Sequence, residues 1–128
     1  VYRSLHGGIL PPNDETRELL RDVPPERLFT PESRSAINRN YLPDGSDPDG
    51  YAFPGGHALA GLPEVLIVNA ELDSLRPSGE AFAAELAAAS VDVRVVRERG
   101  AMHGYLNEVG HPAAEHTLVL LEEAVTGR

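Results

Sequence analysis

An aspartate and a histidine are the two residues of this sequence whose types and spacing suggest chemistry. Asp73 ends an apolar stretch of the chain, and His103 stands about thirty residues later, between Met102 and Gly104. A carboxylate beside an imidazole fixes the ring tautomer through Nδ1–H and stabilises the imidazolium that forms when the ring takes a proton. The two residues therefore predict a general base for a hydroxyl nucleophile, if the fold brings them together.

The residues between the aspartate and the histidine predict the elements that would position them. A strand over 64–72 contains four consecutive apolar residues, which is typical of a strand covered on both faces in a parallel sheet. A helix over 77–90 follows, and a second, less buried strand begins at Val91. The expected inward positions of the helix are Phe82, Leu86 and Ala89. In a right-handed strand–helix–strand crossover both parallel strands end at the same edge, where ligands gather.

Three further helices are expected outside this unit. Residues 15–22 form a short helix capped by Asn13 or Asp14. Residues 30–40 form a second one, begun by a threonine N-cap followed by proline. A final helix begins at Pro112. Its expected inward positions are Leu118, Leu121 and Val125, with Gly127 past its end.

Loops account for most of the remaining sequence. Residues 1–12 are expected to be the tail of a strand that runs into a loop, because glycine and proline recur there. Residues 42–56 form a long loop that Tyr51 and Phe53 are expected to hold down. The segment 100–109, after the second strand, is a further expected loop.

Residues 62–107 resemble the C-terminal part of α/β-hydrolase-fold esterases and lipases of the hormone-sensitive-lipase-like group. In that group a strand, an acid in a D-x-L-R setting, a helix, a strand and H-G-[FY] follow in this order, as they do around Asp73 and His103. The resemblance implies an α/β fold, namely a parallel βαβ unit with flanking helices that corresponds to the C-terminal part of a three-layer α/β-hydrolase fold. It also implies that Asp73 is the acid and His103 the base of a catalytic triad.

The nucleophile of such a triad is the missing member. It belongs on a G-x-S-x-G elbow, and no serine of this sequence has glycine at both flanking positions. The motif His6-Gly7-Gly8 resembles an oxyanion loop, but in the family that loop comes before the elbow, so chain order argues against this assignment. Because the chain also begins without methionine, we expect residues 1–128 to be one partial hydrolase domain of a longer protein. The domain has two parts. Residues 1–60 form a region of helices and a long loop, and residues 61–128 form a strand–helix–strand–helix unit that carries the triad acid and base.

Two hypotheses of different classes follow. The chain is the C-terminal portion of a serine carboxylesterase or lipase that acts on small carboxylic esters once the missing half completes it. Alternatively, it is a non-catalytic fold fragment or an oligomerising interaction module. Loss of a triad nucleophile costs about a millionfold in turnover, so the isolated chain is expected to be inactive. Its first strand would have an open edge, so we expect a homo-oligomer or association with the missing half.

Simpler structural roles compete with these assignments. A single aspartate at a strand end is often a helix cap or the partner of a nearby arginine, here Arg76. We expect Arg76 to tether the loop through Glu71 or Asp73.

The totals exclude several other classes of function. The net charge is −9, the sequence has no lysine, and its arginines are scattered, which argues against a nucleic-acid partner. There is no cysteine, no apolar run of about 18 residues and no signal pattern, so we expect a soluble, cytoplasmic chain without a membrane span. His103, His111 and His116 lack the spacing of a metal site, because an i, i+5 pair does not share a helical face. We expect no metal and no cofactor.

Overall fold

The computed structural model describes residues 10–45, 47 and 49–127 of the chain. The first nine residues of the expected strand tail, with the motif His6-Gly7-Gly8, lie outside the described residues.

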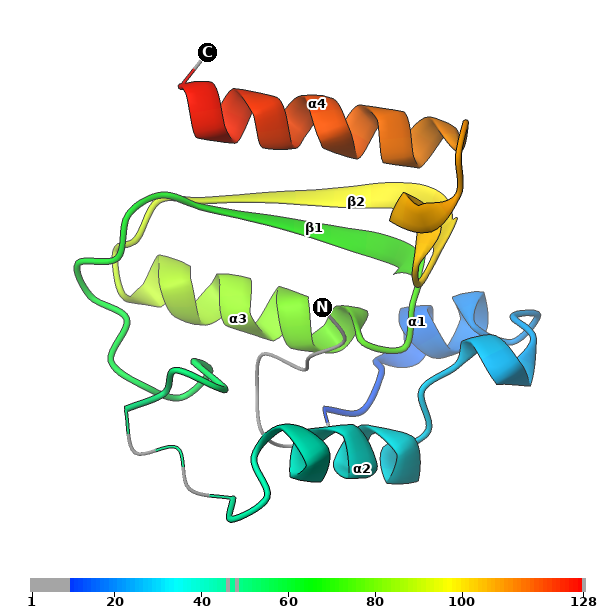
Figure 1. The fold of residues 1–128 in the computed structure, drawn as a ribbon, viewed down its shortest axis with the longest axis horizontal. Helices are drawn as coiled ribbons and strands as arrows, with labels where there is room; N and C mark the ends of the chain where they lie inside the picture. The colour runs from blue at the N-terminus through cyan, green and yellow to red at the C-terminus, as the bar shows by residue number, and fades with distance from the viewer. Residues whose placement is uncertain (1–9, 46, 48, 128) are drawn as a thin grey trace.

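The centre of the structure is a parallel two-stranded sheet. Strand β1 (Val65–Leu72) pairs with β2 (Val93–Met102), and helix α3 (Arg76–Ala88) connects them. Helix α3 covers one face of the sheet and α4 (Pro112–Thr126) covers the other, which gives three layers (Figure 1). The predicted βαβ unit with flanking helices is therefore confirmed, and β2 is the more exposed strand, as expected.

A hydrophobic core lies between α3 and the sheet. The expected inward residues Phe82 and Leu86 are 6% and 0% exposed, and they pack against Ile67 of β1. A second cluster lies between the sheet and α4 and consists mainly of small side chains. Its members are Ala70, Ala101, Tyr105, Ala113 and Ala114. The small side chains let α4 approach β2 closely.

The predicted inward face of the last helix is wrong. Leu118, Leu121 and Val125 are 60%, 42% and 85% exposed. The buried positions of α4 are Ala113, Ala114, Thr117 and Leu120. The helix carries two stripes of helical spacing, and the stripe that contains Leu120 and Thr117 is buried, while the stripe predicted from the sequence stays largely exposed. The C-terminal end is as expected, because Gly127 caps α4 in the left-handed conformation with φ 68°.

Two helices and a short 3-10 turn, η1 (Pro25–Arg27), precede the sheet. The first helix, α1 (Asp14–Leu19), begins at an Asn13 cap, one of the two caps predicted, and ends earlier than expected. The chain turns after Leu19 to bury Leu20 and Val23, so the apolar contacts lie in the turn. Helix α2 (Pro31–Tyr41) begins at its threonine cap, whose Oγ1 accepts the Ser33 N–H at 3.2 Å.

Strand β2 runs further than the sequence predicted. Gly100, taken as the start of a loop, lies inside the strand with φ 69° at a bulge opposite β1. The carboxylate of Glu71 accepts the Gly100 N–H at 2.9 Å and holds the bulge. The strand then ends at Met102, and the expected loop contains a 3-10 turn, η2 (Tyr105–Asn107). The bulge therefore sets the direction in which β2 reaches His103.

The long loop between α2 and β1 is held down by Phe53 and an aspartate. Phe53 is 8% exposed, whereas Tyr51 is 89% exposed, so the expected role of Tyr51 is wrong. Asp47 Oδ2 accepts the N–H groups of Ala52 and Phe53 at 3.1 and 2.7 Å. Burial raises the pKa of the Asp47 carboxyl, but these backbone donors outweigh it, so that pKa lies below its usual value. Phe53 is therefore an anchor of the loop, as expected, and the hydrogen-bonded turn at Asp47 takes the place of the role expected of Tyr51.

Replacing Ser90 by glycine is expected to stabilise the protein. Ser90 has φ 59° after the end of α3, where Val91 N–H bonds the Leu86 carbonyl at 3.0 Å and closes the helix. A non-glycine residue in this conformation costs about 1 kcal/mol, which Ser90→Gly removes. Urea unfolding should show the increase, and Gly100→Ala, at a position already occupied by glycine with φ 69°, should show a decrease.

Candidate active site

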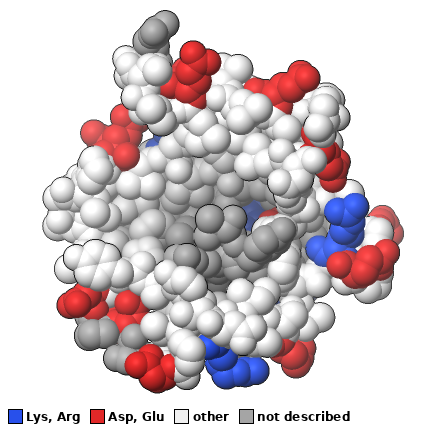
Figure 2. All heavy atoms as spheres, in the orientation of Figure 1, with Lys and Arg blue, Asp and Glu red and all other residues white. Residues whose placement is uncertain are grey.

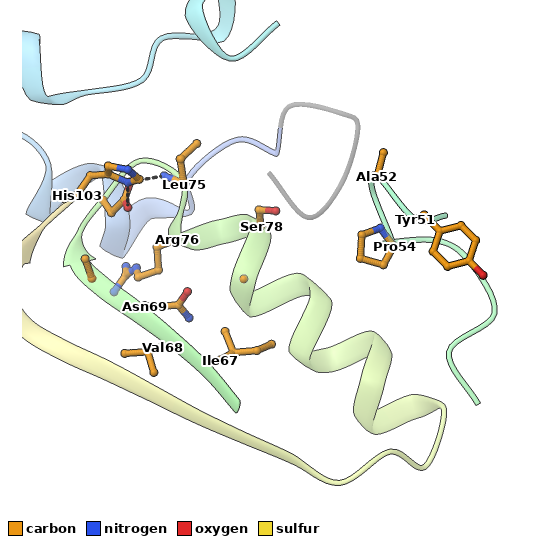
Figure 3. Close-up of a pocket in the computed structure, with 13 residues that line it drawn as sticks. Tyr51, Ala52, Pro54, Ile67, Val68, Asn69, Leu75, Arg76, Ser78 and His103 are labelled. Atoms are coloured by element: carbon orange, nitrogen blue, oxygen red, sulfur yellow. Dashed lines mark hydrogen bonds and ion pairs between the residues drawn. The ribbon is translucent and has the colours of Figure 1, made fainter. Parts of the chain in front are cut away.

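The sheet brings Asp73 and His103 together at the carboxyl ends of its two strands. Asp73 follows β1 directly and His103 follows β2 directly. His103 Nδ1 lies 2.7 Å from Asp73 Oδ2, and the two side chains are 19% and 11% exposed. Figure 3 shows this contact at one end of a cavity beside β1. The parallel crossover thus produces the proximity that the sequence predicted.

Both carboxylate oxygens of Asp73 are engaged. Oδ1 accepts the backbone N–H of Leu75 at 2.8 Å, so Asp73 also closes the turn before α3. The N-cap residue of α3 is Leu75, without a side-chain cap, so the helix-cap role considered for Asp73 is wrong. Oδ2 faces the imidazole. Because a carboxylate only accepts hydrogen bonds, Nδ1 of His103 carries the proton in this contact and Nε2 is the basic nitrogen of the neutral ring. This is the tautomer that a general base requires.

The imidazole is also held by an aromatic contact. The ring of Phe29 meets His103 edge-on, with centroids 4.7 Å apart and an interplanar angle of 71°. The backbone N–H of Phe29 donates to Ser74 Oγ at 2.9 Å, which ties this segment to the residue after Asp73. The orientation of the ring therefore depends on the segment before α2 as well as on the sheet.

Arg34 on α2 is a buried arginine near the pair. It is 8% exposed, and its Nη1 donates to the carbonyls of Leu10 and Ser74 at 3.3 and 3.5 Å. Burial lowers the pKa of the Arg34 guanidinium, and the charge of Asp73 opposes that shift. Sequence reasoning missed Arg34, because only the fold places α2 against the turn after β1.

Arg76 is structural, as expected, but its predicted partners are wrong. The side chain is fully buried, donates to Thr16 Oγ1 of α1 and lies 3.5 Å from Glu80 Oε1. Glu71 instead binds the bulge at Gly100. The Thr16 contact joins segments 60 residues apart, which local spacing could not show. Arg76 therefore fixes α1 to the start of α3.

Two cavities meet at the Asp73–His103 pair. One of about 430 Å³ lies on the α3 side and is bounded by Asn69, Arg76 and, across the opening, Tyr51 (Figure 3). The other, of about 490 Å³, lies on the α4 side and is bounded by Leu66, Tyr105 and Leu121 among others. Charged side chains, most of them acidic, stand around the margin of the face in Figure 2.

His111 and His116 have structural contacts. His111 caps α4 through Nδ1, which accepts the Ala113 N–H at 3.2 Å, and His116 Nδ1 lies 2.7 Å from Glu98 Oε1. In residues 10–45, 47 and 49–127 no three acidic or histidine side chains are grouped as a metal site would require. Within the same residues no helix has the length and apolar character needed to cross a membrane.

The sequence matches a known family over most of its length. Residues 5–107 match the family described as the alpha/beta hydrolase fold. Carboxylesterase NlhH of Mycobacterium tuberculosis, from strains CDC 1551 / Oshkosh and ATCC 25618 / H37Rv, is 44% identical over 54 residues, which are 42% of this chain and 17% of the relative.

A solved structure supports the same relationship. The structure described as "Pyrobaculum calidifontis esterase monoclinic form" is similar with a TM-score of 0.66 and 27% sequence identity. The similarity covers 94% of this chain and 38% of the esterase chain. This chain therefore spans well under half of the length of both relatives.

Proposed function

Since the chain belongs to the alpha/beta hydrolase fold family, we propose that it is the C-terminal portion of a serine carboxylesterase. Asp73 is the acid and His103 the base of its triad. The observation that carries the proposal is the 2.7 Å contact between His103 Nδ1 and Asp73 Oδ2 at the edge where β1 and β2 end. The carboxylesterase and esterase relatives support the substrate class, a small carboxylic ester.

The proposed reaction uses the free nitrogen lone pair of the imidazole twice. His103 Nε2 takes the proton of a serine hydroxyl as its oxygen attacks the ester carbonyl, and then gives that proton to the departing alcohol. In the second half of the reaction His103 Nε2 takes a proton from a water molecule as the water oxygen attacks the acyl-enzyme. It then returns that proton to the serine oxygen, so the acyl–serine bond breaks and the carboxylic acid leaves. Asp73 keeps the imidazole in the required tautomer and stabilises the imidazolium between the steps.

The serine and the oxyanion hole are proposed to lie in a part of the protein outside this chain. No serine here stands in a G-x-S-x-G elbow. Of the serines near the pair, Ser74 binds the backbone of Phe29 through its hydroxyl, and Ser78 is 5% exposed at the start of α3. The relatives, of which this chain covers 17% and 38%, have room for that missing half.

The isolated chain is expected to be inactive on esters. Incubation with p-nitrophenyl acetate should release nitrophenol no faster than His103→Ala does, and a fluorophosphonate should label no serine, because the nucleophile is absent. A version extended upstream to include an elbow should hydrolyse the ester and lose this activity in His103→Ala. Labelling of the 128-residue chain that disappears in Ser78→Ala would contradict the proposal and identify Ser78 as the nucleophile.

A non-catalytic, associating module is the second candidate, and exposed apolar surface favours it. In the described part of the chain β1 pairs with β2 alone, so one of its edges is unpaired. Helix α4 exposes Leu118, Leu121 and Val125. As a module on its own, the chain would cover these groups by association with another copy of itself.

The isolated chain is therefore expected to self-associate. Sedimentation velocity at micromolar concentration should show a dimer or larger species, because an exposed apolar stripe and a free strand edge favour burial. Leu118→Lys should lower the associated fraction, whereas Arg39→Lys, on the exposed end of α2, should leave it unchanged. A compact monomer for the unchanged chain would contradict the prediction.

A further inference from the structure

The buried carboxylate of Glu98 on β2 is connected to the loop that contains His103 through the hydroxyl groups of Thr117 and Tyr105. Glu98 is 6% exposed, and its Oε1 accepts from Thr117 Oγ1 of α4 at 3.1 Å. Thr117 Oγ1 lies 2.8 Å from the hydroxyl of Tyr105 in η2, and both of these residues are buried. None of the three is part of the proposed triad. Tyr105 is the aromatic residue of the H-G-[FY] motif, but the sequence pattern gave it no role and did not single out Glu98 or Thr117.

The direction of these hydrogen bonds follows from proton counting. Thr117 has one hydroxyl proton and gives it to Glu98, because a carboxylate can only accept. The proton between Tyr105 and Thr117 must then come from Tyr105. Burial raises the pKa of the Tyr105 phenol; the bond to Thr117 lowers it, and the Glu98 charge raises it further. The net shift is upward, which is consistent with a phenol that donates a hydrogen bond.

We call the hydrogen-bonded series Glu98–Thr117–Tyr105 the relay. It ends at Tyr105, with one residue between Tyr105 and the proposed base, His103. Tyr105 is separated from His103 only by Gly104, which has φ 85° and turns the chain sharply. Tyr105 lies in the small-residue cluster beside Ala101, which is 0% exposed and precedes His103 by two residues. The backbone of His103 is thus held between a fixed strand end and a fixed tyrosine ring.

We propose that Glu98, Thr117 and Tyr105 are positioning residues that hold the His103 loop so that Nδ1 stays against Asp73. This rests on the proposed function, since it assigns to the relay the support of the proposed base. Asp73 orients the ring from β1, and the relay fixes the backbone of the same residue from β2 and α4. Hydrophobic packing alone would hold α4 on the sheet and would avoid the desolvation cost of burying the Glu98 carboxylate. The relay does something that packing does not, because its directed hydrogen bonds also fix the orientation of the Tyr105 ring.

The test measures the His103 imidazole rather than catalysis, so it can fail separately from the proposed function. In proton NMR of the 128-residue chain, the Nδ1 proton bonded to Asp73 should appear far downfield and exchange slowly with water. Tyr105→Phe and Thr117→Val each remove one relay hydroxyl with little change in shape. Each variant should exchange that proton about fivefold faster, the factor that one net hydrogen bond is worth.

Matched variants separate positioning from a general loss of stability. Thr117→Ser keeps the hydroxyl and should restore slow exchange, and Thr126→Val changes an exposed threonine of the same helix and should have no effect. The double variant of Tyr105 and Thr117 should exchange no faster than either single one, because both break the same relay. An unchanged exchange rate in both single variants would overturn the proposal, as would the absence of the downfield signal from the unchanged chain.

Discussion

Replacing Asp73 by asparagine is expected to lower kcat for ester hydrolysis by about four orders of magnitude, in a version of the protein extended upstream to include the nucleophile elbow. Asparagine keeps the acceptor for the Leu75 N–H, so the turn into α3 should remain. It can present an N–H to His103 Nδ1, which then has to accept. The ring proton moves to Nε2, and the nitrogen that should take the serine proton is no longer basic.

The measurement is steady-state kinetics on a p-nitrophenyl ester, with kcat and KM separated. KM should change little, because Asp73 acts on the transition state through His103 and not on substrate binding. Asp92→Asn is the matched control, since this exposed carboxylate lies at the opposite end of β2 and should leave kcat unaltered. A fall of less than about tenfold in Asp73→Asn would remove Asp73 from the triad.

Replacing Leu86 by alanine is expected to lower the free energy of unfolding by about 3 kcal/mol. Leu86 is 0% exposed at the centre of the core between α3 and the sheet, so alanine leaves a cavity there that the neighbours fill only in part. For a domain whose total stability is about 5–15 kcal/mol, this is a large loss. Urea unfolding followed by far-ultraviolet circular dichroism would measure it.

Leu118→Ala is the matched control for this prediction. The same side chain is removed, but Leu118 is 60% exposed, so the change should stay within about 0.5 kcal/mol. The comparison must be made at a concentration at which the chain is monomeric, because the exposed face of α4 is proposed to associate. If Leu86→Ala and Leu118→Ala lowered the free energy of unfolding equally, Leu118 would have to be buried. The buried face of α4 would then be the one predicted from the sequence.

Much of the central unit could be predicted from the sequence because its signals are local. The apolar run of β1, the helical spacing of Phe82 and Leu86 and the order of the elements indicate a parallel crossover. Because the two strands of such a crossover are parallel, their carboxyl ends lie at one edge, and Asp73 and His103 lie there with them. The caps at Asn13 and Thr30 were also readable, since a cap depends on residues three apart in the chain.

Contacts between distant segments could not be predicted in this way. The Thr16–Arg76 bond and the relay from Glu98 to Tyr105 join residues on different elements, and local spacing contains no information about such pairs. The bulge at Gly100 was misread because glycine marks a loop as readily as it marks a bulge.

The sequence by itself determined which residues form a carboxylate–imidazole pair and the strand ends from which they come. Only the tertiary structure decided how that pair is held, and which stripe of α4 is buried. The physical reason is that helical periodicity offered α4 two apolar stripes of similar spacing, and the choice depends on what the sheet presents. Ala70 of β1 and Ala101 of β2 lie in one cluster with Ala113 and Ala114 of the buried stripe. Thr117 on that stripe connects Glu98 with Tyr105.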